Sequence, residues 1–197
     1  MFKFSKRDPA DGTDAVGAIL KAAADPKIIS FAGGLPAPEL FPVEGMKEAT
    51  DKVYAEHGQQ ALQYGAAKGV TELRELILKR VKEKENIDAK LENVMVTTGS
   101  EQAIDLVGKA FVNPGDTVLV EEPTYLCALD VFRSYGANFV SVPMDDDGMK
   151  MDALEEALKA HPETALVYTV PNFQNPTGRT MPAERRKKFA ELAAKYD

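Results

Sequence analysis

The sequence is 197 residues long, with 44% hydrophobic and 28% charged residues, which excludes a disordered or low-complexity chain. Its formal net charge of -7, from 24 Lys and Arg against 31 Asp and Glu, lacks the broad positive field that attracts nucleic acids. No stretch approaches the ~20 apolar residues of a membrane span, and the basic start Met1–Arg7 lacks the apolar centre of a secretory signal. We therefore expect a folded cytoplasmic protein without a nucleic-acid or membrane partner.

The first part of the chain shows no strand alternation. It contains an irregular segment rich in Gly and Pro at residues 32–38, followed by two predicted helices at residues 44–57 and 70–84. One face of the second helix is apolar and consists of Val70, Leu73, Leu76, Ile77 and Val81. Arg74 is expected to lie outside this face. We expect the apolar face to cover either a sheet or a neighbouring subunit.

From Asn93 onward, short apolar runs alternate with amphipathic stretches, a pattern typical of parallel strands joined by crossover helices. Strands are predicted at residues 94–97, 117–120, 138–142 and 165–170. Helices are predicted at residues 101–111, 124–135, 151–160 and 182–196. The acidic segment Asp145–Gly148 lacks the alternating ligands of a calcium loop, so we expect a plain turn and no metal site. The predicted fold class is α/β, with an open, mostly parallel sheet flanked by helices and an irregular, helical N-terminal segment.

The segment Thr97–Gln102 lies where a predicted strand ends and a helix begins. Backbone N–H groups at a helix start, with the positive end of the helix dipole, hold an anion without any lysine. Ser100 adds a hydroxyl, at the carboxyl edge of a strand where open α/β sheets bind ligands. The turn therefore predicts a phosphate site. The alternative is that Ser100 only caps the helix.

Two further loops follow predicted strands. The segment Glu121–Tyr125 places an aromatic ring at a strand end, where it can fix the plane of a flat ligand. The segment Thr169–Gly178 is dense in Pro, Asn and Gly, which is typical of a rigid loop that aims an amide side chain into a pocket. The alternatives are packing for Tyr125 and a structural turn for the Asn175-Pro176 dipeptide.

These loops occur in order along the chain, with Gln63–Gly65 and Gly33–Pro36 upstream of them. Together they resemble the class I and II aminotransferases of fold type I, which use pyridoxal phosphate. The segments Ile29–Pro36 and Tyr168–Gly178 point most closely to the group acting on 2-aminoadipate, kynurenine, aromatic or branched-chain amino acids. The resemblance extends from Ile28 to Asp197.

The resemblance implies that the parent protein transfers an amino group from an amino acid to a 2-oxo acid with pyridoxal 5'-phosphate. It implies that Ser100 and the backbone of Glu101 hold the cofactor phosphate. It also implies that Tyr125 stacks on the pyridine ring, and that Asn175 donates to the ring hydroxyl oxygen. Glu101 replaces the Gln frequent at its position, and a carboxylate beside a phosphate dianion is repulsive. We therefore expect only its backbone to contribute.

Two positions of the N-terminal part imply a homodimer by the same resemblance. Tyr64 would reach the phosphate in the other subunit's site. Gly34 would line the substrate pocket together with Asn175, at a point where a side chain would obstruct it. The resemblance further divides the chain into an N-terminal arm and small-domain segment, residues 1–45, and the first part of the cofactor-binding large domain, residues 46–197.

No catalytic residue is identifiable in this chain. In the family, the lysine that binds the cofactor covalently, the carboxylate that keeps its ring nitrogen protonated and the arginine that binds the substrate carboxylate come later. We expect them beyond Asp197, with part of the substrate-selecting residues, and expect the fragment alone to be inactive. The basic residues of the last predicted helix, Arg185–Lys188 and Lys195, are interpreted as solvated charge.

Three alternatives remain. A fold-type I lyase or decarboxylase would use the same cofactor, but the opening segment disfavours it. A transcription regulator with an aminotransferase-like ligand-sensing domain would carry a basic helix-turn-helix region first, and only about 30 residues precede the resemblance here. The third alternative is a short protein that dimerises but has lost catalysis.

Overall fold

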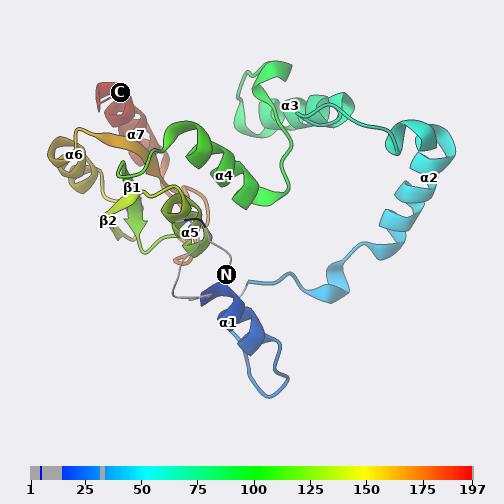
Figure 1. Ribbon diagram of the computed structural model, residues 1–197, viewed down its shortest axis with the longest axis horizontal. Coiled ribbons are helices and arrows are strands. Elements are labelled where there is room, and N and C mark those ends of the chain that lie inside the picture. Colours follow the sequence, from blue (N-terminus) through cyan, green and yellow to red (C-terminus); the bar gives the residue numbers. More distant parts are fainter. Residues whose placement is uncertain (1–4, 6–14, 32–33, 197) are drawn as a thin grey trace. The chain divides into compact units, whose positions relative to one another are not determined.

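The computed structural model describes residue 5 and residues 15–31 and 34–196. The chain divides into two compact units, Ala18–Thr98 and Gly99–Asp197, the latter grouped with Met1–Gly17. Figure 1 follows both units in sequence colours. Among the described residues, no helix has the length and apolar character that crossing a membrane requires.

The Gly99–Asp197 unit contains a four-stranded sheet in the order β3-β2-β1-β4. Its strands are β1 (Thr117–Glu122), β2 (Asn138–Asp145), β3 (Gly148–Met149) and β4 (Thr164–Tyr168). β1 is central and pairs in parallel with β2 on one side and with β4 on the other. β3 pairs antiparallel with β2 after the acidic turn, and β4 forms the opposite edge. The predicted α/β fold with a mostly parallel sheet is confirmed.

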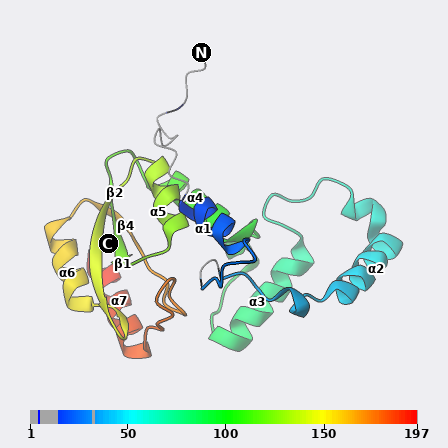
Figure 2. The same ribbon diagram turned by 90° about the horizontal axis from the view of Figure 1, so that it is seen from below.

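Helices cover both faces of this sheet. They are α4 (Gly99–Phe111), α5 (Leu126–Ser134), α6 (Met151–Ala160) and α7 (Ala183–Tyr196). Val118 and Val120 of β1 belong to one buried cluster with Phe132 of α5, whereas Leu119 belongs to a second cluster with Leu154 of α6. Figure 2 shows α5 and α6 on opposite sides of the sheet. Because both faces are covered, the middle of β1, Val118–Val120, is an unbroken apolar run.

The Ala18–Thr98 unit is helical. Its elements are α1 (Ala15–Ala23), which crosses the boundary between the units, η1 (Pro38–Leu40), α2 (Val43–Ala61), α3 (Thr71–Glu85) and η2 (Leu91–Asn93). α2 and α3 match the two predicted helices, whereas α1 was not predicted. The predicted irregular segment includes Ala32 and Gly33, which lie outside the described residues.

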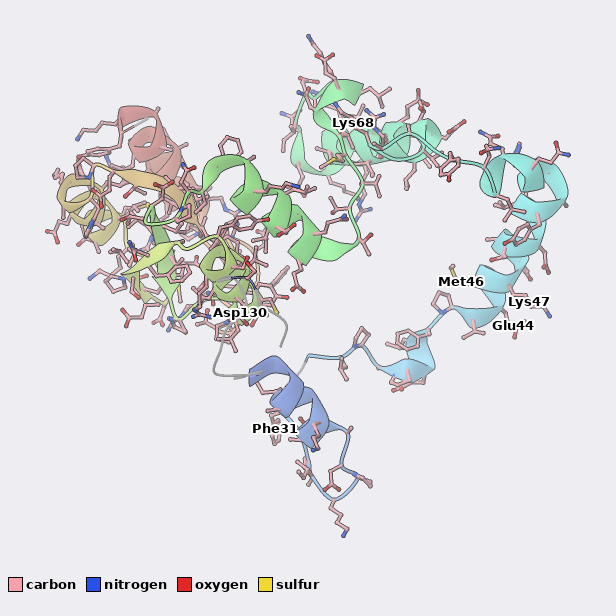
Figure 3. The ribbon with its side chains drawn as sticks, in the orientation of Figure 1. Phe31, Glu44, Met46, Lys47, Lys68 and Asp130 are labelled. Atoms are coloured by element: carbon pink, nitrogen blue, oxygen red, sulfur yellow. The ribbon has the colours of Figure 1, made fainter. Side chains whose placement is uncertain are left out.

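Large apolar side chains of this helical unit are exposed. Phe31 and Tyr64 are both 100% exposed, and Leu40 is 79% exposed. Figure 3 shows Phe31 and Met46 projecting from their segments. Exposed apolar surface of this extent is typical of a region that another chain or segment covers.

Arg74 corrects the predicted orientation of α3. It is the one buried residue among those of Ala18–Thr98 whose side chains the structure describes, whereas Leu73 and Leu76 of the predicted apolar face are exposed. The guanidinium donates to the backbone oxygen of Val94 from Nε at 2.9 Å and to that of Leu91 from the other end of the group. Arg74 turns inward because these carbonyl groups supply acceptors that an aliphatic side chain could not use.

The predicted strand at residues 94–97 is wrong for this structure, because these residues form no strand. Val96 donates one backbone hydrogen bond, to Lys68 at 3.0 Å, and Val94 accepts from the Arg74 side chain. An apolar, β-prone run becomes a strand only where another backbone pairs with it along its length. The other predicted strands and helices are confirmed, with ends that shift by a few residues.

Candidate functional site

The turn at residues 97–100 includes the start of α4, whose first residue is Gly99. Gly99 has a φ of +77°, and a Cβ built there would meet no heavy atom within 4 Å. Glycine is therefore favoured by the backbone conformation and not by crowding. Ser100 and Glu101 lie in the first turn and are exposed. The first turn of a helix presents N–H groups without intrahelical acceptors, at the positive end of the helix dipole, so an anion is stabilised there.

Tyr125 lies at the N-cap of α5 and is half-buried against the cluster that contains Val118 and Phe132. Its pKa is raised to about 12, chiefly by the hydrogen bond between its hydroxyl and Cys127, then by burial and by nearby groups that include Glu101. The phenol therefore stays neutral at physiological pH. Ile104 of α4 packs against the same buried cluster as Tyr125.

The buried carboxylate of Glu121, at the end of β1, links this strand to the loop after β4. Glu121 is 2% exposed. Its Oε1 accepts a hydrogen bond from Thr169 Oγ1 at 2.6 Å, and the backbone N–H of Val170 lies 3.3 and 3.4 Å from its two oxygens. Its Oε2 accepts from Gln174 Nε2 at 2.9 Å.

Gln174, also 2% exposed, connects the loop that carries Asn175 to the loop that carries Tyr125. Its Nε2 donates to Glu121 and, at 2.9 Å, to the backbone oxygen of Pro123. Its Oε1 accepts from the backbone N–H of Thr177 at 3.0 Å and from the Thr177 hydroxyl at 2.7 Å. Both donor hydrogens and the acceptor of this amide are therefore used, and the two loops are held together.

The predicted residues thus lie in one compact unit, with Ser100 and Glu101 in the first turn of α4 and with Tyr125 and Asn175 on two loops. Ile104 of α4 and Tyr125 pack against one buried cluster, and the residue before Asn175 is hydrogen-bonded to the loop before Tyr125. Asn175 itself is exposed. Their joint binding of one ligand stays a prediction.

Thr124 carries a polar atom that the described structure leaves without a partner. Its side chain is 7% exposed, and its hydroxyl makes no hydrogen bond among the described residues. Burying a hydroxyl in this way costs roughly 1–3 kcal/mol. Because Thr124 adjoins Tyr125, the loop retains hydrogen-bonding capacity for a further group.

The two predicted site residues of Ala18–Thr98 are both exposed. Gly34 has a φ of +54°, and a Cβ built there would meet no heavy atom within 4 Å in the described structure. Its backbone conformation gives a reason for glycine; its role in a substrate pocket stays a prediction. Tyr64 is fully exposed, and its backbone N–H donates to Gln63 Oε1 at 2.8 Å.

The interpretation of the basic residues of α7 as solvated charge is wrong for Arg185 and Arg186, which are half-buried, whereas Lys187 and Lys188 are exposed. Arg185 pairs with Asp145 at 2.5 Å and is 19% exposed in its side chain. Arg186 donates to the backbone oxygens of Met181 at 2.7 Å and Pro171 at 3.0 Å. These two side chains join α7 to the β2–β3 turn and to the loop after β4. Lys195, more than half exposed, pairs with Glu155 of α6 at 2.5 Å.

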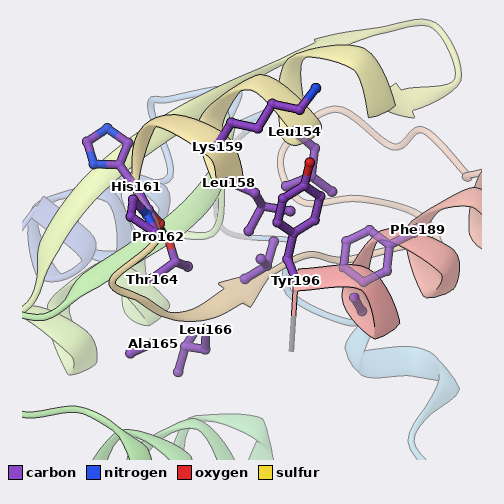
Figure 4. A pocket seen from close by; sticks show the side chains of 12 residues that line it. Leu154, Leu158, Lys159, His161, Pro162, Thr164, Ala165, Leu166, Phe189 and Tyr196 are labelled. Carbon is purple, nitrogen blue, oxygen red and sulfur yellow. Dashed lines mark hydrogen bonds between the residues drawn. The ribbon is translucent and has the colours of Figure 1, made fainter.

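A separate apolar pocket of about 510 Å³ lies between α6, β4 and α7. Leu158, Leu166, Phe189 and Tyr196 are among its lining residues, which Figure 4 shows from close by. None of the predicted site residues lines it.

In the described part of the chain, no cluster of three or more His, Cys, Asp or Glu side chains is arranged to hold a metal ion.

Glu121, Thr124 and Gln174 were not among the predicted site residues. The signal for Glu121 was a carboxylate directly after the buried run of β1, where a charged residue requires hydrogen-bond donors. Gln174 gave no such signal, because its partners lie up to 53 positions away in the sequence.

Comparisons with known proteins place the chain in one family. The family model described as aminotransferase class I and II matches residues 26–197. Aromatic-amino-acid aminotransferase 1 of Thermococcus litoralis is 46% identical over 98% of this chain and 48% of its own length. The 2-aminoadipate transaminase of Thermus thermophilus is 44% identical over 88% of this chain and 42% of its own length.

The similarity extends to solved structures. The kynurenine aminotransferase of Pyrococcus horikoshii, solved in complex with PMP, superposes with a TM-score of 0.89 at 43% identity, over 98% of this chain and 49% of that one. The α-aminoadipate aminotransferase LysN of Thermus thermophilus superposes with a TM-score of 0.85 at 40% identity, over 98% of this chain and 46% of that one. This chain spans about half the length of the curated relatives it matches.

Proposed function

Because the chain belongs to the class I and II aminotransferases, we propose that it forms the phosphate- and ring-binding half of a site that transfers an amino group between an amino acid and a 2-oxo acid. The observation that carries this proposal is the hydrogen bond from Gln174 to Pro123, which ties the Asn175 loop to the Tyr125 loop. The named relatives favour transamination over a lyase or a ligand sensor.

The residues present fit pyridoxal 5'-phosphate. The first turn of α4 suits a phosphate, and Tyr125 packs against the buried cluster while it stays partly exposed. The buried hydroxyl of Thr124 supplies a polar group next to that ring without a partner of its own. When bound, the cofactor supplies an electron sink for charge that develops at the substrate α-carbon.

This chain's own residues bind and orient. Ser100 and the backbone of Glu101 hold the phosphate by hydrogen bonds that the helix dipole strengthens. Tyr125, neutral because its pKa is about 12, stacks on the ring. Asn175 donates from its amide to the ring hydroxyl oxygen, and we assign no proton transfer to any residue of this chain.

The dimer and the domain division belong to the same proposal. Tyr64, fully exposed, would contact the phosphate in the partner's site, and Gly34 would line the substrate pocket together with Asn175. Residues 1–45 would form the arm and small-domain segment, and residues 46–197 the first part of the large domain. We further propose an amino acid and a 2-oxo acid as substrates and the cytoplasm as the location.

Incubation of the chain with pyridoxal phosphate, followed by borohydride reduction and peptide mapping, tests this assignment. We expect ligand binding that Tyr125→Ala and Asn175→Ala both weaken, and no single specifically labelled lysine. One specific lysine would refute the view that the covalent residue lies outside this chain. For the full-length protein, mass spectrometry of amino-donor consumption across the standard amino acids would identify the donor.

A further inference from the structure

The loops that carry Tyr125 and Asn175 share one buried polar connection, made by Glu121 and Gln174. Both side chains are 2% exposed, and both lie one to four positions from a residue proposed to touch the cofactor. Neither reaches the surface on which a ligand would lie. Their contacts therefore act through the loops that they hold.

The two side chains have complementary hydrogen-bonding groups. The Glu121 carboxylate is surrounded by donors from Thr169, Val170 and Gln174, and it has no ion pair among the described residues. The Gln174 amide donates to Glu121 and Pro123 and accepts from Thr177. Only an amide has both donors and an acceptor at that position, whereas a carboxylate or an aliphatic side chain would leave buried groups unpaired.

The connection fixes the two loops relative to each other. Pro123 lies two positions before Tyr125, and Gln174 directly precedes Asn175, so one side chain sets the separation between the stacking ring and the amide. A planar ligand that needs both contacts at once is sensitive to that separation, because small displacements weaken several directional interactions together.

We propose that Glu121 and Gln174 are positioning residues, which hold Tyr125 and Asn175 at the spacing that the cofactor ring requires. The proposal rests on the proposed function for the identity of the ligand. The coupling between the two loops is independent of the identity of the ligand, because it follows from hydrogen bonds within the chain.

The first experiment measures binding of pyridoxamine 5'-phosphate, which lacks the aldehyde that would react with surface lysines. The variants are Gln174→Met, which removes donors and acceptor at similar length, and Glu121→Gln. Exposed Glu122, the next residue along β1, provides the matched control Glu122→Gln. Affinity is measured by fluorescence titration, well below the melting temperature of each variant.

We expect Gln174→Met and Glu121→Gln to bind about tenfold more weakly, the factor that ~1.4 kcal/mol of lost hydrogen bonding produces, and Glu122→Gln to bind as the wild type does. A lower melting temperature with unchanged affinity would show a purely structural role and overturn the proposal. In Glu121→Gln/Gln174→Glu, one donor–acceptor pair is restored, so this double variant should bind more tightly than Gln174→Glu alone. Equal affinity of the two would also contradict the proposal.

The second experiment needs no ligand and follows amide hydrogen exchange by mass spectrometry. In Gln174→Met we expect faster exchange in residues 122–126 as well as in residues 169–178, because the lost side chain joins both. Acceleration confined to residues 169–178 would overturn the coupling. If the wild-type chain does not bind pyridoxamine phosphate, the proposed function fails for this chain, and the exchange measurement still decides whether the two loops are coupled.

Discussion

Thr124 follows β1 and Thr169 follows β4, and the two hydroxyl groups differ in their hydrogen-bond partners. Thr124 Oγ1 has no partner in the described structure, whereas Thr169 Oγ1 donates to Glu121 at 2.6 Å. Replacement of each by valine keeps the shape and removes the hydroxyl. Comparing the two variants therefore distinguishes the loss of a hydroxyl without a hydrogen-bond partner from the loss of a hydroxyl that has one.

We expect Thr124→Val to raise the free energy of unfolding of the ligand-free chain by ~1 kcal/mol, because a buried hydroxyl without a partner is removed. Thr169→Val should lower it by ~1–3 kcal/mol, because the buried carboxylate of Glu121 loses a donor. Urea denaturation measures both. A destabilised Thr124→Val variant would show that this hydroxyl is hydrogen-bonded in solution.

Short local motifs pointed to individual site residues, whereas pairings between side chains far apart in the sequence left no local pattern. Ser100, Tyr125 and Asn175 were singled out on segments that follow predicted strand ends, and the family resemblance implied their roles. The pairing of Glu121 with Gln174 depends on how β1 and β4 lie side by side. No local pattern encodes that register.

The contact between α4 and α5 depends on a glycine inside a helix. A Cβ on Gly108 would lie 2.8 Å from Cδ2 of Tyr135, whose hydroxyl donates to Asp105 at 2.8 Å and so fixes the ring. We expect Gly108→Ala to destabilise the chain by ~1–3 kcal/mol through this overlap, although alanine is the better helix former. Thermal unfolding followed by circular dichroism measures the change.

Gly45 in α2 provides the control, because a Cβ there would meet nothing within 4 Å. Gly45→Ala should stabilise the chain slightly, by up to ~1 kcal/mol, through helix propensity alone. Equal effects of the two substitutions would contradict the overlap at Tyr135.

α6 and α7 are joined by a charged contact that depends on pH. Lys195 and Tyr196 donate to Glu155, and these hydrogen bonds lower the pKa of Glu155 from 4.5 to about 2. The unfolded chain therefore binds more protons than the folded chain between those values, and stability falls as pH falls through this window. Glu155→Gln should be less stable than the wild type at pH 6, and the difference should shrink as pH drops below 4.5. Urea midpoints across this pH range measure it, and a constant difference would contradict the expectation.

Except for the short strand β3, the elements from β1 to α7 followed from hydrophobic periodicity, whereas residues 94–97 did not become a strand. Both β1 and residues 94–97 are apolar and β-prone, but β1 has parallel neighbours on both sides. Hydrophobic periodicity indicates which secondary structure a segment prefers, but a strand forms only where a neighbouring strand pairs with it. The same limit explains Arg74, whose buried position depends on carbonyl groups that only the folded chain brings near α3.

We expect two copies of the chain to associate into a homodimer through the exposed apolar side chains of Ala18–Thr98. Leu40→Ser should weaken this association, because Leu40 is 79% exposed and contributes apolar surface that a partner would bury. Phe111→Ser, at a 66% exposed residue of α4 in the other unit, is the control. Sedimentation velocity at several concentrations measures both, and a wild-type chain that stays monomeric would contradict the expectation.

β4 has a consequence for how the chain behaves in concentrated solution. It lies at the sheet edge, and its sequence Thr164–Tyr168 contains neither a charge nor a proline. Its outer side faces no strand among the described residues, so its peptide groups form a template on which another copy can hydrogen-bond. Stacking of such edges leads toward fibrils, and thioflavin fluorescence of concentrated solutions of the chain should reveal their growth.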